Sequence, residues 1–329
     1  SIEAEISALA AGSIALAEPT ELGRARRMLD SVGRYVEFAK STLPGRMRLD
    51  GLKLVVDCAN GAAYRTAPDT LYELGAEVVP LAIMPDGLNI NEGCGAVYPQ
   101  VMATSVVAHG ADAGICLDGD ADRLIMSDEN GGIIDGDQIL GCLALAMQEK
   151  GTLSSNSVVG TVMSNCGLET MLGKAGIDLH RVAVGDRYIL EKMRNDELNL
   201  GGEPSGHILM TDFARSGDGL LTALQMLTLL RGSTKKASEL FNGFKPNPQR
   251  LENLTGIDPI ILQSNSLRAA IREIETGLGK RGRVLVRPSG TEALIRVMVE
   301  AESEPLLTAT MDALILRITE EFRKIAKNQ

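Results

Sequence analysis

Three aspartates at alternate positions are the residues of this sequence best suited to chemistry. They belong to the segment DGDADR, 118–123, which follows an apolar run at 113–117 that is typical of a short buried strand. In an extended backbone, residues two apart point to the same side, so Asp118, Asp120 and Asp122 would face one another. Such carboxylates repel unless a cation lies between them. Oxygen ligands suit Mg²⁺ or Ca²⁺, so we expect a divalent metal here.

Two other interpretations of this segment remain open at the level of sequence. An EF-hand loop would match the three aspartates at its first, third and fifth positions and Glu129 at its twelfth. However, Arg123 occupies the sixth position, where the sharp turn of an EF-hand needs Gly. A solvated acidic turn without a metal is the other alternative.

A second polar loop, RPSGTE at 287–292, follows a predicted strand at 283–286. Hydroxyls, backbone N–H groups near a glycine and a guanidinium can together wrap a phosphate dianion. A plain surface turn explains the same letters equally well. The candidate phosphate-binding residues are Arg287, Ser289, Gly290 and Thr291, with Arg296 as a second guanidinium.

Two further loops could hold a sugar. In GEPSGH, 202–207, Glu203 and Ser205 are spaced to bridge hydroxyl groups, and His207 could transfer protons near neutral pH. A structural histidine is the alternative for His207. The segment GDR, Gly185, Asp186 and Arg187, ends a predicted strand, where α/β proteins bind ligands, but a helix N-cap by Asp186 explains it equally well.

These loops require a scaffold of alternating strands and helices. Apolar runs at 52–58 and 76–83 flank one predicted helix, and runs at 157–163 and 179–184 flank another, which indicates two α/β units with parallel sheets. A helix is predicted over 21–40, and 217–230 forms another. A linker with two prolines is expected at 244–253, followed by a smaller α+β unit.

The amino-acid composition argues against some classes of binding partner. The 329 residues carry 33 Lys+Arg and 43 Asp+Glu, a formal charge of −10, with 3% aromatics and no Trp, which argues against a nucleic-acid partner. No apolar run is long enough to span a bilayer, so no membrane partner is expected. Five widely spaced cysteines without a CxxC favour a reducing cytoplasm over disulfides or zinc. A homodimer through helical segments is one option that the residues do not decide.

Taken together, the four loops resemble the α-D-phosphohexomutase superfamily, whose motifs they match in order and in approximate spacing. PDGLNINEGCGA at 85–96 and RPSGTEALIRVM at 287–298 are most similar to the bacterial phosphoglucosamine mutases. The resemblance covers essentially the whole chain. It implies tandem α/β/α domains with mixed or parallel sheets and a smaller α+β C-terminal domain. The implied divisions are 1–40 (the end of domain I), 41–133 (domain II), 134–243 (domain III) and 244–329 (domain IV).

The resemblance implies an isomerase that interconverts glucosamine 6-phosphate and glucosamine 1-phosphate, for UDP-N-acetylglucosamine and peptidoglycan precursor synthesis. An enzyme phosphoserine would donate its phosphoryl group, with glucosamine 1,6-bisphosphate as intermediate and primer. Mg²⁺ would bind the three aspartates, and Arg123 would add positive charge beside it. Reorientation of the intermediate implies a cleft that opens and closes about the linker.

Three departures from the family pattern are small: Ala121 and Ala293 stand where Gly and Pro are usual, and Pro204 occupies a variable position. A larger one is that the Ser-His-Asn-Pro context of the family's phosphoserine does not occur in these 329 residues. We therefore expect a chain that begins near the end of the nucleophile domain and is inactive alone. Two alternatives stay open: a phosphomannomutase/phosphoglucomutase of the same mechanism, and a non-catalytic phosphosugar- or calcium-binding module.

Overall fold

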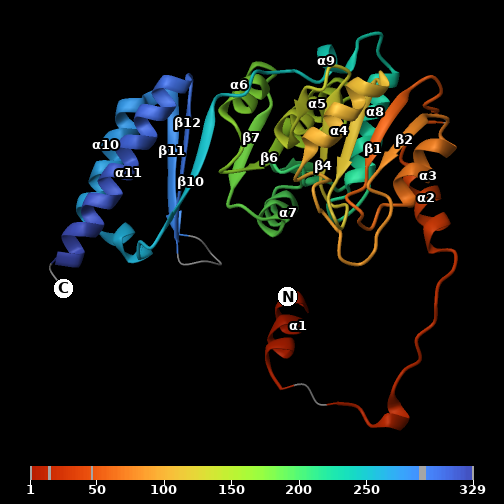
Figure 1. Cartoon of the computed structure of the whole chain (residues 1–329), viewed down its shortest axis with the longest axis horizontal. Helices are drawn as coiled ribbons and strands as arrows, with labels where there is room; N and C mark the ends of the chain where they lie inside the picture. The colour runs from red at the N-terminus through yellow and green to blue at the C-terminus, as the bar shows by residue number, and fades with distance from the viewer. Residues whose placement is uncertain (1, 14–15, 46, 289–293, 328–329) are drawn as a thin grey trace.

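The structure is a computed structural model that describes residues 2–13, 16–45, 47–288 and 294–327. Three β-sheets follow one another along the chain, and each carries helices of its own (Figure 1). The predicted α/β class and the smaller C-terminal unit are confirmed.

The first sheet has the strand order β2-β1-β3-β4-β5. Its strands are β1 (Lys53–Asp57), β2 (Glu77–Leu81), β3 (Ala113–Leu117), β4 (Leu124–Asp128) and β5 (Ile133–Ile134). β1 pairs in parallel with β2 and β3, whereas β4 runs antiparallel to β3. Every residue of β3 is buried, as expected for a strand covered on both faces. The segment 118–123 therefore connects two adjacent antiparallel strands.

The helices of this unit are α2 (Ser31–Ser41), α3 (Thr66–Glu73) and α4 (Pro99–His109). Pro99 opens α4 at a position where its missing N–H costs nothing, and Gly110 ends the helix in the left-handed region. α3 packs against β2, and α4 packs against β3 and β4.

The second sheet has the order β7-β6-β8-β9. Its strands are β6 (Ser157–Thr161), β7 (Asp178–Val182), β8 (Leu200–Gly202) and β9 (Ile208–Met210). The helices in this part of the chain are α5 (Gly136–Glu149), α6 (Cys166–Lys174), α7 (Asp186–Asn195), α8 (Gly219–Arg231) and α9 (Ala237–Leu240), and α9 packs against β4 of the first sheet. β6 pairs in parallel with β7 and β8, which confirms the predicted second strand-helix-strand unit. A capping box between Asp135 and Gln138 begins α5.

One hydrophobic core serves both of these units. α8 packs against β3 and β4 of the first sheet and against β9 of the second. Its side chains Leu220, Leu224 and Leu227 belong to the same buried cluster as Ile115 in β3 and Leu200 in β8. The two sheets are thus joined through a shared helical layer.

The C-terminal unit has its own core. Its antiparallel sheet has the order β10-β12-β11, and the strands are β10 (Gln249–Thr255), β11 (Gly282–Pro288) and β12 (Leu294–Ala301). α10 (Asn265–Leu278) and α11 (Glu304–Lys327) cover one face of this sheet (Figure 1). The predicted linker over 244–253 is partly wrong, because β10 begins at Gln249, directly after Pro248. A proline is tolerated immediately before a strand, where no ladder N–H is required.

The predicted helix over 21–40 is correct only in its second half. Helical structure occurs at α1 (Ile2–Ala11), in a single turn at Pro19–Glu21, and again in α2. Leu22, Met28 and Leu29 are exposed, and without a surface to bury them the helical spacing alone does not sustain a helix. Among the described residues, no helix is both long enough and apolar enough to cross a membrane.

Candidate active site

The three aspartates of the segment 118–123 converge as the sequence predicts. One carboxylate oxygen from each of Asp118, Asp120 and Asp122 lies within 4.8 Å of the other two. Asp118 is buried, Asp122 is partly buried and Asp120 is exposed, so the group opens to solvent on one side. This is a set of hard oxygen donors, and it fits a divalent cation such as Mg²⁺ or Ca²⁺.

The electrostatics of the three aspartates also favour a cation. Burial raises the pKa of Asp118 to about 6, and the neighbouring carboxylates of Asp122 and Asp120 act in the same direction, whereas a hydrogen bond from the backbone of Arg123 opposes them. Asp122 Oδ1 is buried and accepts no hydrogen bond from the described residues. The Arg123 guanidinium lies 3.7 Å from both Asp118 and Asp122, too far for a strong hydrogen bond.

The EF-hand interpretation is wrong. An EF-hand loop joins two helices, whereas this loop joins β3 to β4. Glu129, the residue at the twelfth position, accepts hydrogen bonds from the backbone and hydroxyl of Ser238 instead.

The loop 202–207 packs directly on the aspartates. His207 Nδ1 lies 3.0 Å from Asp122 Oδ2, and the backbone N–H of Leu124 donates to Gly206 O at 3.0 Å. A Cβ on Gly206 would lie 2.1 Å from Leu124 O, and Gly206 has φ +92°, so both the close contact and the backbone require glycine. His207 is only 5% exposed and its Nε2 has no partner among the described residues. The ring is therefore placed to orient Asp122.

Glu203 joins two of the predicted loops. Its Oε1 accepts from the backbone N–H of Gly185 at 2.9 Å, and its Oε2 accepts from Ser205 Oγ at 3.1 Å. Asp186 is the first residue of α7, and the Arg187 guanidinium stacks 4.8 Å from the centre of the Tyr188 ring. The candidate sugar-binding groups thus come together through residues that are far apart in the sequence.

In the C-terminal unit, two arginines occupy directly opposed positions. Arg287 on β11 pairs with Arg296 on β12 in the antiparallel register. Side chains at directly opposed positions of an antiparallel pair lie close together, so two guanidiniums placed in this way could both contact one anion. Ser289, Gly290 and Thr291 lie outside the described residues.

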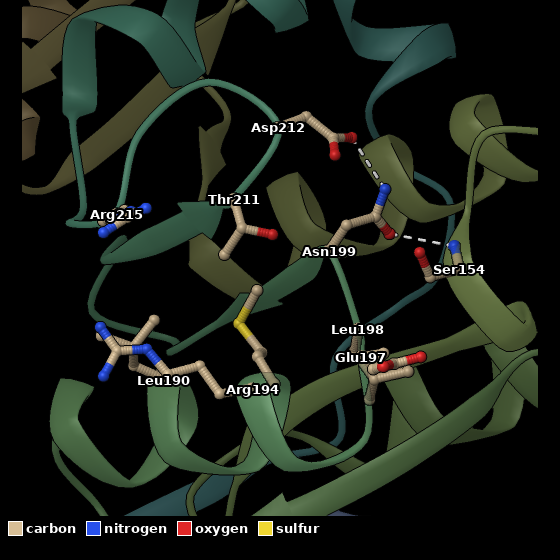
Figure 2. Close-up of a pocket in the computed structure, with 10 residues that line it drawn as sticks. Ser154, Leu190, Arg194, Glu197, Leu198, Asn199, Thr211, Asp212 and Arg215 are labelled. Carbon is tan, nitrogen blue, oxygen red and sulfur yellow. Dashed lines mark hydrogen bonds between the residues drawn. The ribbon is translucent and has the colours of Figure 1, made fainter.

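A separate cavity of about 580 Å³ lies between α7 and the segment after β9 (Figure 2). Asn199 bridges one side of it, because its amide donates to Asp212 and its oxygen accepts from the Ser154 backbone. Arg194 and Arg215 lie at the other side in the view of Figure 2. An adjoining cavity of about 600 Å³ reaches Asp186 and Arg187. Neither cavity is lined by the three aspartates, and both carry charges of both signs.

The segment Gly217-Asp218-Gly219 also contacts the site, and the sequence analysis did not identify it. Gly219 N donates to Ala121 O at 2.8 Å, and a Cβ on Gly217 would lie 2.4 Å from the His207 ring. Asp218 caps α8 through Leu221 N and accepts a hydrogen bond from the Tyr35 hydroxyl. A Gly-Asp-Gly sequence directly before an apolar helix is a capping signal that could have indicated this contact.

Comparison with protein-family models identifies the same architecture. The phosphoglucomutase/phosphomannomutase models match as alpha/beta/alpha domain II over residues 33–132, alpha/beta/alpha domain III over 135–246 and C-terminal domain over 249–317. The chain belongs to the phosphoglucomutase/phosphomannomutase family.

The chain is similar to individual members of this family over about 70% of their length. It is 53% identical over 319 residues to a phosphoglucosamine mutase of Paracoccus denitrificans, covering 96% of this chain and 71% of that protein. A phosphoglucosamine mutase of Roseobacter denitrificans is 50% identical over 95% of this chain and 70% of its own length.

Solved structures share the fold. A phosphoglucomutase/phosphomannomutase family protein from Burkholderia thailandensis superimposes with a TM-score of 0.74 at 24% identity, over 88% of this chain and 64% of its own. An N-acetylphosphoglucosamine mutase of Aspergillus fumigatus, solved with GlcNAc-6P and magnesium, gives a TM-score of 0.69 at 22% identity, over 85% of this chain and 65% of its own.

Proposed function

We propose that this chain is the metal- and substrate-binding part of a phosphoglucosamine mutase, which interconverts glucosamine 6-phosphate and glucosamine 1-phosphate. The observation that carries the proposal is identity of about half of all residues to proteins of that name, over 95–96% of the chain. The convergence of the three aspartates with the loop 202–207 supports it. The predicted domain boundaries near 40, 133 and 243 are part of this proposal.

Mg²⁺ is the proposed metal, and Asp118, Asp120 and Asp122 would hold it. A cation bound there would neutralise negative charge on the phosphoryl group during transfer. The fit rests on the oxygen-only donors and on Asp122 Oδ1, which is buried and accepts no hydrogen bond from the described residues. The Aspergillus relative was solved with magnesium, which agrees with this assignment.

The remaining residues of the site bind and orient the phosphosugar. Glu203 and Ser205 are proposed to accept and donate hydrogen bonds to the sugar hydroxyls. Arg287 and Arg296 would hold the phosphate that does not react, since opposed guanidiniums match a dianion. His207 is proposed to act through Asp122, which it contacts, and only secondarily as a proton carrier, since its ring is buried.

In the complete enzyme, a phosphoserine outside these 329 residues is proposed to donate the phosphoryl group. Glucosamine 1,6-bisphosphate would form, turn over in the site and return its other phosphoryl group to the serine. The product would serve UDP-N-acetylglucosamine and peptidoglycan precursor synthesis in the cytoplasm.

The test is a turnover assay on the full-length protein with Mg²⁺ and a bisphosphate primer. Conversion of glucosamine 6-phosphate is expected, and Asp120→Asn should abolish it. Glu275→Gln is the matched control, because Glu275 is exposed on α10 and loses the same charge far from the site. Conversion of mannose phosphates with no action on glucosamine 6-phosphate would favour the phosphomannomutase alternative. Binding of a phosphosugar without conversion would favour a non-catalytic module.

A further inference from the structure

An ion pair between a partly exposed arginine and a buried glutamate of the C-terminal sheet connects this unit to the second sheet. Arg283 on β11 and Glu300 on β12 occupy opposed positions in the antiparallel register. Arg283 Nε donates to Glu300 Oε2 at 2.8 Å, and Glu300 is 0% exposed. A carboxylate so deeply buried must be compensated by charge and by hydrogen bonds.

The hydrogen bonds that compensate these charges come from the unit that contains the second sheet. Arg283 Nη1 donates to Val162 O at 2.5 Å, and Nη2 donates to Ser164 O at 2.6 Å. Glu300 Oε1 accepts from the backbone N–H of Cys166 at 2.7 Å. Cys166 is the first residue of α6, where a backbone N–H has no partner within the helix and the helix dipole favours a negative charge. Each charged group therefore contacts its partner and the β6–α6 connection at once.

That connection is itself held firmly. Asn165 N donates to Asp137 Oδ2 at 2.6 Å, which fixes the segment to the start of α5. The Asn165 side chain also exchanges two hydrogen bonds of 3.0 Å with the backbone of Asn247, just before β10. The ion pair thus contacts a connection that is held in place by its own hydrogen bonds. Asn247 links the same connection to the C-terminal unit a second time.

The strands that carry this ion pair also carry the opposed arginines of the candidate phosphate site. Arg287 lies four residues after Arg283 on β11, and Arg296 lies four residues before Glu300 on β12. Side chains four apart on a strand point to the same face. At about 3.3 Å per residue, the two pairs are roughly 13 Å apart on one rigid ribbon. A tilt of about 10° at the anchor would move the arginines by roughly 2 Å over that distance.

We propose that Arg283 and Glu300 are positioning residues that set the distance and direction of Arg287 and Arg296 relative to the sugar loop. The proposal rests on the phosphate role given to the two arginines above. It does not depend on which hexose the enzyme accepts.

The test uses the full-length enzyme with the double variant Arg283→Met/Glu300→Leu, because removing both charges leaves neither one buried alone. Arg283→Lys is a second variant that keeps the charge but loses the planar fork. The control is Arg250→Lys, since the Arg250 guanidinium pairs with Glu252 on its own strand, β10, in the same sheet. Misplacement by an ångström or more costs on the order of a hundredfold in such sites, so we expect KM for glucosamine 6-phosphate to rise about 10- to 100-fold in the double variant. The Mg²⁺ dependence should stay within about twofold of wild type, since the three aspartates are not disturbed.

A second measurement tests the positioning role independently of the substrate proposed above. Hydrogen exchange without ligand should show faster exchange of the Cys166 amide in the double variant and no change in the control. If the enzyme accepts another hexose phosphate, KM for that sugar replaces the first readout. Unchanged KM in both variants at a temperature where they are folded would overturn the positioning role, whatever the effect on melting temperature.

Discussion

The carboxyl group of Asp137 allows a direct test of how burial changes a pKa and, with it, the stability of this protein. Asp137 lies in the first turn of α5, is 1% exposed, and has an Oδ1 with no hydrogen-bond partner among the described residues. Burial raises its pKa from 3.8 to about 7, although the hydrogen bond from Asn165 N opposes the shift. The folded protein therefore binds a proton between pH 4 and 7 that the unfolded chain has released.

The sign of the effect follows directly. Because the folded-state pKa is the higher one, the stabilisation is complete below pH 4 and is lost as the pH rises through 7. At about 1.4 kcal/mol per pKa unit, a shift of this size corresponds to about 4 kcal/mol in total, of which about 2–3 kcal/mol falls between pH 5 and 8. Asp137→Asn keeps an acceptor for Asn165 N and removes the titration. The variant should therefore gain about 2–3 kcal/mol relative to wild type between pH 5 and 8.

Urea unfolding followed by circular dichroism measures this difference, since the chain has no Trp for fluorescence. Subtracting the two proteins at each pH cancels the contributions of other groups such as Asp118 and Asp218, whose pKa values are also raised by burial. Carbon NMR of the Asp137 carboxyl gives its pKa independently. A stability difference that stays constant with pH, together with an NMR pKa near 4, would refute the reasoning.

Four further outcomes are expected. Asp120→Asn should weaken Mg²⁺ binding at least tenfold by calorimetry, with Glu275→Gln unchanged. His207→Ala should weaken it about 10- to 100-fold through loss of the contact to Asp122, and an unchanged affinity would contradict that role. Ala121→Gly should stabilise the protein by roughly 0.5–1 kcal/mol, because Ala121 has φ 63°, and a lower melting temperature would count against this. Gly206→Ala should lower the melting temperature by several degrees, since its Cβ would overlap Leu124 O.

The local features of the site could be predicted because they depend on spacing along the chain. Three aspartates two residues apart after a buried strand leave few geometric options, and they do converge. The contact between His207 and Asp122 joins residues 85 positions apart, so periodicity carries no information about it. The resemblance to a known family placed the loops together, but not the particular hydrogen bonds.

Three elements show where local patterns were insufficient. β4 was not predicted, because only its first three residues, Leu124 to Met126, are apolar, and so short a run before Ser127 and Asp128 does not indicate a strand. The prolines near residue 247 favoured a linker and hid the start of β10. The segment 22–30 has helical spacing but exposed apolar side chains, and tertiary packing decides whether such a segment forms a helix.

The helix α8 has a consequence for how this family can diversify. Because its side chains fill one core shared by the first two sheets, those sheets should unfold as a single cooperative unit. Cutting the chain near residue 133 would expose that core on both fragments. Neither of the first two α/β units is therefore expected to fold when it is moved into another protein. The C-terminal unit, with a core of its own, is the part that recombination between relatives could replace intact, provided that the replacement still fits the β6–α6 connection.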